Sequence, residues 1–274
     1  MTETPPARPT STSFLDLLEP RLLADPIVQS LIAILAVSAF FVVFPGLDVW
    51  FSRLFYAAGQ SFPASQLPGF VGLRDIGRWL TRLIPTALVI VVVARIAWPE
   101  KRSAVPLRDV IFLLSTLAIG SGIIVNLIFK LNWGRPRPTM VTLFGGNQPF
   151  VGVWRITDYC HGSCSFVSGE GSTAFWLLAT AIVFAPRWRP FADRLLLVLA
   201  VLISFDRIAM GGHFLSDVLL SWAITALVLA IGHRLIIERP PLWLTEEALQ
   251  ARATEAGRAL RRLASRERGE TSGR

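Results

Sequence analysis

Long blocks of apolar residues are the feature that most limits what this chain can fold into. Of its 274 residues, 53% are hydrophobic and only 17% are charged. A soluble domain of this length would be far less apolar, whereas runs of about 20 apolar residues are typical of membrane-spanning helices. We therefore expect an all-α integral membrane protein, a bundle of about six transmembrane helices. The strongest blocks are 27–44, 83–98, 110–129, 172–185, 195–205 and 214–237.

Basic residues predict how this bundle is oriented. They cluster after the second, fourth and sixth blocks, which lie on one side if the chain alternates. The positive-inside rule places that side in the cytoplasm, here of a bacterial inner membrane. We expect a cytoplasmic N-terminal tail (1–24), a membrane domain (25–237) and a basic cytoplasmic C-terminal tail (238–274). No signal peptide is apparent, and residues 13–23 fit either a surface helix or a disordered tail.

The formal net charge of +8 follows from this orientation, so we expect no nucleic-acid partner. Arginines also occur in the loops 45–82, 130–170 and 206–213, which would face the periplasm. Such cations run against the usual bias and indicate that the outer face binds an anion. Contact with lipid headgroups is the alternative, and it is favoured for Arg53 and Arg74.

Four charged side chains stand at predicted helix ends on this outer face. Lys130 ends the third block, Arg137 follows in a Gly- and Pro-rich turn, Arg207 ends the fifth block, and His213 opens the sixth. Ionisable residues at membrane depth are costly and mark functional sites. We expect the three cations to converge on an oxyanion, with the side chain of Arg135 pointing elsewhere in its extended Arg-Pro-Arg-Pro segment.

Two short patterns add to these cations. Ser168 and Gly169 precede the fourth block, and a helix that begins with small residues presents backbone N–H groups to phosphate, although simple capping by the serine is the default interpretation. His213 and Asp217 are four residues apart and would share one face of a helix. The carboxylate would then accept a hydrogen bond from one imidazole nitrogen and leave the other free to attack phosphorus.

Together these patterns resemble the motifs of the type 2 phosphatidic acid phosphatase superfamily of membrane lipid phosphatases. The resemblance implies a metal-independent, cofactor-free phosphatase that forms a phosphohistidine on His213. It also implies that the three cations hold the phosphoryl oxygens with help from Ser168 and Gly169. The matching residues are Lys130, Arg137 and Pro138 for the first motif, Ser168 and Gly169 for the second, and Arg207, His213 and Asp217 for the third.

Glu170 departs from the second motif, where the family has a histidine that protonates the leaving group and later activates water. Nearby cations and a helix N-terminus favour an ionised carboxylate, which can activate water but cannot donate a proton. We therefore expect Glu170 to act mainly as a base, or else to be a structural salt-bridge partner of Arg137 or Arg207. A poor proton donor favours a good leaving group, as in an anomeric glycolipid phosphate of the lipid A type or a prenyl diphosphate.

The two cysteines, Cys160 and Cys164, flank His161 just before the second motif. A disulfide that braces Ser168, a metal site that lacks a clear fourth ligand, and a free pair are all open. His161 is a further candidate proton donor.

We expect a membrane lipid phosphatase that acts on a lipid phosphate in the bilayer, in an unspecified oligomeric state. A lipid phosphotransferase that uses the same phosphohistidine is the nearest alternative. A non-catalytic phospholipid-binding or transport protein is the alternative from another class. Release of inorganic phosphate would distinguish the three.

Overall fold

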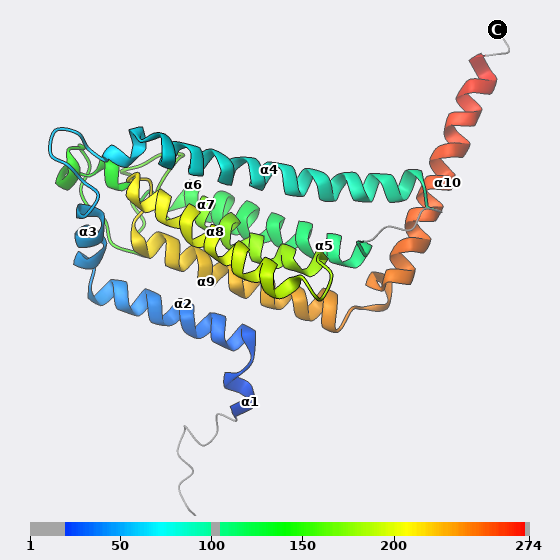
Figure 1. Cartoon of the computed structure of the whole chain (residues 1–274), viewed down its shortest axis with the longest axis horizontal. Coiled ribbons are helices and arrows are strands. Elements are labelled where there is room, and N and C mark those ends of the chain that lie inside the picture. Colours follow the sequence, from blue (N-terminus) through cyan, green and yellow to red (C-terminus); the bar gives the residue numbers. More distant parts are fainter. Residues whose placement is uncertain (1–19, 100–104, 272–274) are drawn as a thin grey trace, which may run out of the picture.

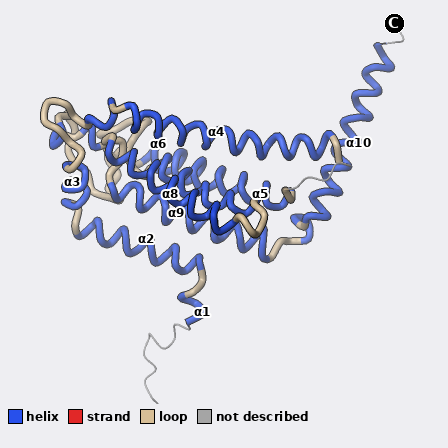
Figure 2. Tube along the Cα trace, in the orientation of Figure 1, coloured by secondary structure: helices blue, strands red, loops and turns tan. Residues whose placement is uncertain are grey.

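The computed structural model describes residues 20–99 and 105–271, and every regular element among them is a helix (Figure 1; Figure 2). The α-helices are α1 (Pro20–Leu23), α2 (Pro26–Val43), α3 (Gly46–Arg53), α4 (Pro68–Ala97), α5 (Leu107–Leu117), α6 (Lys130–Asn132), α7 (Gly169–Trp176), α8 (Arg189–Ala209), α9 (Leu215–Gly232) and α10 (Glu246–Thr271). The 3₁₀ turns are η1 (Pro63–Gln66), η3 (Pro138–Met140), η4 (Thr142–Phe144), η5 (Leu177–Val183) and η7 (Leu242–Leu244), and the π-helical stretches are η2 (Ala118–Phe129) and η6 (His233–Glu238).

The long helices lie side by side along the long axis of the molecule, so the expected helical bundle is confirmed (Figure 1). The short helix α3 and the long loops gather at one end of this bundle, and α1 and α10 lie at the opposite end. Of the segment 13–23, where a surface helix was considered, residues 13–19 lie outside the described part of the chain and the rest forms α1. Most of the predicted C-terminal tail forms the helix α10.

Six membrane-spanning helices were expected, but fewer helices in the described part of the chain are long and apolar enough to cross a membrane. Within the described ranges, four helical stretches are long and apolar enough to cross a membrane: Pro26–Val43, Pro68–Ala97, Leu107–Asn132 and Leu215–Glu238. The other two predicted spans correspond to α7 with η5 and to α8. The first is too short, and the second carries charged residues at both ends. Both nevertheless belong to the bundle, because α7 packs against α8 and α9, and α8 also packs against α4.

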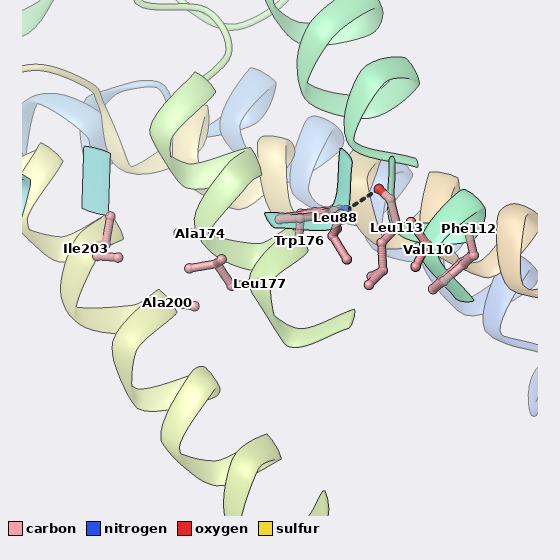
Figure 3. Packing of buried hydrophobic residues seen from close by; sticks show 9 residues of the cluster. All are labelled: Leu88, Val110, Phe112, Leu113, Ala174, Trp176, Leu177, Ala200 and Ile203. Atoms are coloured by element: carbon pink, nitrogen blue, oxygen red, sulfur yellow. Dashed lines mark hydrogen bonds between the residues drawn. The ribbon is translucent and has the colours of Figure 1, made fainter. Parts of the chain in front are cut away.

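The core joins α4, α5, α7 and α8 (Figure 3). At its centre the buried indole of Trp176 donates a hydrogen bond from Nε1 to the backbone oxygen of Leu113, at 3.1 Å. Since lipid tails are as apolar as leucine, helices in a bilayer associate through close packing and such hydrogen bonds. Small residues permit the approach: a Cβ added to Gly232 would lie 2.5 Å from Thr116 Cγ2. This core fixes the helix ends that carry the charged residues.

One carboxylate helps to attach the C-terminal helix to the opposite end of the bundle. Glu246 accepts hydrogen bonds from the backbone N–H groups of Leu107, at 3.1 Å, and Arg108, at 3.0 Å. These groups open α5 and have no partner within their own helix. Glu246 therefore caps α5 from outside, and the segment after residue 237 begins in contact with the membrane domain.

Candidate active site

The charged residues predicted to converge do lie together, at the end of the bundle that carries α3. Lys130 stands near the end of the helix Leu107–Asn132, Glu170 in the first turn of α7, Arg207 in the last turn of α8, and His213 in the turn before α9. A Cβ added to Gly169 would lie 2.8 Å from Lys130 Nζ, so the ammonium group lies against the start of α7. Four helix ends thus build one charged cluster.

His213 is held with one ring nitrogen bound and the other free. Its side chain is fully buried, and Nδ1 lies 2.7 Å from the backbone oxygen of Ser165. A carbonyl only accepts hydrogen bonds, so Nδ1 carries the proton and Nε2 keeps its lone pair. Within the described part of the chain, Nε2 is buried without a hydrogen-bond partner. Burial also lowers the pKa of His213, against the opposing effect of Glu170, which favours the neutral imidazole that a nucleophile requires.

The expected hydrogen bond from His213 to Asp217 is wrong. The helix α9 begins at Leu215, so His213 lies in a turn, and the rule for residues four apart on a helix does not apply. Asp217 instead accepts hydrogen bonds from the guanidinium of Arg135, the hydroxyl of Ser165 and the backbone N–H of Phe214. The carboxylate therefore acts on His213 through Ser165, whose backbone oxygen holds Nδ1.

Glu170 lies between Arg207 and the free nitrogen of His213. Its Oε2 atom is 3.0 Å from Arg207 Nε and 3.6 Å from His213 Nε2. Its side chain is 29% exposed, whereas that of His213 is fully buried, so solvent reaches the cluster at this carboxylate. The salt bridge to Arg207 is present as considered, and the same position suits a base beside the nucleophile.

Positive charge is in excess around this carboxylate. Lys130 and Arg137 both interact electrostatically with Glu170 and with Arg207, so three cations surround this carboxylate. Burial and the neighbouring Arg207 guanidinium lower the pKa of Arg137. Such a group of cations is complementary to an anionic phosphate group.

The start of α7 adds backbone donors. Ser168 is the N-cap residue, and its hydroxyl accepts from Gly171 N at 3.0 Å, so the default capping role is confirmed. Because the serine oxygen only accepts in this contact, its O–H remains a donor, and the backbone N–H groups of the first turn add to it. Two glycines shape the turn between α8 and α9 that carries His213. Gly211 has φ +68°, and a Cβ on Gly212 would lie 2.6 Å from Arg207 Nη2.

Sequence reasoning missed a buried ion cluster beneath the site. Arg135 points away from the cations as expected, and its fully buried guanidinium binds both Asp217 and Asp48, the latter at 2.8 Å. Asp48 belongs to α3 and also accepts from Ser216 N at 2.9 Å. Burial raises the pKa of Asp48 although Arg135 opposes this. The carboxylate of Asp48, close to the end of the first predicted span, was the signal that could have drawn attention to it.

Cys160 and Cys164 form a disulfide, with their Cα atoms 5.6 Å apart, so neither thiolate is available to a metal. Among the residues that the structure describes, no cluster of three or more His, Cys, Asp or Glu could hold a metal ion. His161 is exposed in the disulfide loop, and His233 lies near the other end of the bundle beside Glu238.

Comparison with known proteins agrees with this geometry. A family model described as "PAP2 superfamily" matches residues 110–241. The Lipid A 4'-phosphatase of Francisella tularensis subsp. novicida is 34% identical over 183 residues, which cover 65% of this chain and 81% of that protein. The Lipid A 4'-phosphatase of Rhizobium leguminosarum is 32% identical over 209 residues, covering 71% and 89%.

A solved structure has the same fold. The transmembrane PAP2 type phosphatidylglycerolphosphate phosphatase from Bacillus subtilis superposes with a TM-score of 0.53 at 17% identity, covering 80% of this chain and 98% of that one.

Proposed function

The chain belongs to the PAP2 superfamily and is a multi-pass membrane lipid phosphatase, and on this premise we propose that it hydrolyses a phosphate monoester of a lipid A-type glycolipid through a phosphohistidine on His213. The observation that carries the mechanism is the Nε2 atom of His213. It is buried, free of a hydrogen-bond partner in the described structure, and next to an arginine and a carboxylate. A lone pair held in this way is ready to attack phosphorus.

In the first step the surplus cations bind the phosphoryl oxygens and Nε2 attacks. The bond from Nε2 to phosphorus forms as the bond from phosphorus to the sugar oxygen breaks, and charge on the phosphoryl group is stabilised by Lys130, Arg137 and Arg207. The Nδ1–H bond to Ser165 O stabilises the positive charge that develops on the imidazole.

The sugar oxygen that leaves needs a proton. The source of this proton bears on which of the substrates favoured from Glu170 the protein can use. The relatives are named for a 4' position, which is not the anomeric carbon, so the departing alkoxide is more basic than the leaving groups favoured from the sequence. A phosphate monoester has its second pKa near 6 and still carries a proton in part of its population at neutral pH. We assign Glu170 the task of passing that proton to the sugar oxygen.

In the second step Glu170 removes a proton from water. The water oxygen bonds to phosphorus, the Nε2–P bond breaks, and inorganic phosphate leaves. The 29% exposure of Glu170 supports this role because the carboxylate reaches solvent at the mouth of the cluster.

We also propose that the site faces the periplasm, with both termini in the cytoplasm of a bacterial inner membrane. The disulfide supports this orientation, because it lies at the same end as His213 and disulfides persist in oxidising compartments. Among the described residues, the start of α8 and the helix α10, which carry basic residues predicted to be cytoplasmic, lie toward the opposite end.

The test is phosphate release by the purified protein in lipid vesicles. Lipid A, phosphatidic acid and a prenyl diphosphate are offered in parallel, and the product is examined by mass spectrometry. We expect release from lipid A, an acid-labile phosphorylated intermediate, and loss of both in His213→Gln. His233→Gln, at the other end of the bundle, is the matched control and keeps full activity. Binding of lipid A without any release by the wild type would overturn the proposal in favour of a binding protein.

A further inference from the structure

The segment from Cys160 to Ser168, which we call the serine loop, contacts both halves of the proposed catalytic machinery. Ser163 binds the guanidinium of Arg137, and Ser165 binds His213 and Asp217. Cys164 lies between these two serines and is tied to Cys160 by the disulfide. One cross-linked segment therefore stands between the phosphate-binding cation and the nucleophile.

The contact with Arg137 fixes the direction of its side chain. Its Nε donates to the backbone oxygen of Ser163 at 2.8 Å, and its Nη2 donates to the Ser163 hydroxyl at 2.7 Å. A guanidinium has five N–H donors in a rigid plane, so two fixed donors determine where the other three point. No carboxylate forms a salt bridge with Arg137 among the described residues, which makes Ser163 its principal support.

The contact with His213 is equally specific. The backbone oxygen of Ser165 accepts from His213 Nδ1 at 2.7 Å, and its hydroxyl donates to Asp217. The backbone N–H of Ser165 donates to the backbone oxygen of Arg135 at 2.8 Å. Three groups of a single residue thus fix the imidazole to the buried ion cluster.

The two serines differ in what holds them. Ser165 is fully buried, whereas Ser163 lies with His161 and Gly162 on an exposed tip. An exposed tip with a glycine at φ +87° has many accessible conformations. The disulfide closes this tip into a small ring and removes most of them.

We propose that Ser163 and the Cys160–Cys164 disulfide are positioning elements, which together hold Arg137 at a fixed place relative to the nucleophile His213. The inference rests on the proposed function, because it concerns how the phosphoryl group is held for attack. A displacement of about 1 Å in such a group lowers the rate by about 100-fold. Opening the ring should therefore weaken catalysis without removing any group that touches the substrate.

The experiment measures kcat and KM for lipid A phosphate release in vesicles, with and without a dithiol reductant. Reduction of the wild type, and separately the double variant Cys160→Ser/Cys164→Ser, should each lower kcat/KM by about 10- to 100-fold. The double variant should not respond to the reductant. Ser163→Gly, which removes one of the two hydrogen bonds, should show a smaller loss. Tyr159→Phe, which changes an exposed side chain next to the ring, is the matched control and should behave as the wild type.

The decisive readout is non-additivity with Arg137. If the ring acts through this guanidinium, reduction has no further effect on kcat/KM in an Arg137→Ala background. An equal loss in both backgrounds would show a merely structural role and overturn the inference, as would a wild type that is indifferent to reduction. If the oxidised wild type releases no phosphate at all, it is the proposed function that fails.

Discussion

The Nε2 atom of His213 and the Oε2 atom of Glu170 lie 3.6 Å apart, and the same oxygen is 3.0 Å from Arg207 Nε. The first distance is too long for a hydrogen bond, whereas the second is a charge-assisted one. A phosphoryl group that approaches Nε2 must therefore take over part of the contact between Glu170 and Arg207. Substrate entry would release the carboxylate for proton transfer.

Glu170→Gln tests that role. The amide keeps the shape of the side chain but cannot accept a proton, so we expect steady-state phosphate release to fall by about 10²- to 10⁴-fold. Because breakdown of the intermediate needs the base most, acid-labile phosphoprotein should accumulate in a rapid-quench experiment. Glu170→His should restore part of the turnover. Full activity in Glu170→Gln would show that the carboxylate is only a salt-bridge partner of Arg207.

Gly169→Ala tests the close approach of Lys130 to α7. The added Cβ would lie 2.8 Å from Lys130 Nζ, so the flexible lysine must move away from the phosphate-binding region. We expect a higher KM and a loss of about tenfold in kcat/KM, with an unchanged melting temperature. The control is Gly72→Ala in α4, where an added Cβ meets nothing within 4 Å. That variant should retain activity and gain up to about 1 kcal/mol in stability.

Asp48→Asn tests the buried ion cluster. The change removes one of the two carboxylates that bind the fully buried Arg135 guanidinium. Breaking a buried pair typically costs about 3–5 kcal/mol, so the melting temperature in detergent should fall clearly. Asp75→Asn, which removes a half-exposed carboxylate 3.6 Å from its arginine partners, should change stability by less than about 1 kcal/mol. Equal effects of the two variants would contradict the role given to Asp48.

His213 should titrate below pH 6.5. Burial lowers its pKa, so the folded protein binds fewer protons than the unfolded chain as the pH falls below that value. The neutral imidazole therefore contributes stability that is fully present above pH 6.5 and is lost as the pH falls through the lower folded pKa. The chain has three histidines, so the ring resonance that disappears in His213→Gln can be assigned by NMR. A titration midpoint of His213 above pH 6.5 would show that burial is not the main influence on its pKa.

The helix ends that carry charge could be predicted from the sequence because each lies where an apolar block stops. This holds for Lys130, Arg207 and His213, and the structure brings all three to one end of the bundle. Glu170 was recognised in another way, because it replaces the histidine of the family's second motif directly after Ser168 and Gly169. For Lys130, Arg207 and His213, the local order of apolar and charged residues carries this information.

Contacts made through the backbone of distant loops could not be predicted in this way. The oxygen that holds His213 Nδ1 belongs to Ser165, and a main-chain oxygen is present at every position in the chain. Asp48 reaches Arg135 from a residue 87 positions earlier, and no periodic pattern connects the two. Likewise α4 begins at Pro68, well before its apolar block, because its first turns are stabilised by packing against α8 and η1.

The link between Asp48 and Arg135 also limits how this enzyme can be recombined with its relatives. The family match begins at residue 110, but Asp48 lies in α3, outside it. A chimera that transplants residues 110–241 into another scaffold would carry the motifs yet leave the buried Arg135 guanidinium with one counter-ion too few. The shortest segment that could be transferred therefore begins before α3. A chimera whose junction lies after α3 must supply an equivalent carboxylate from the other protein.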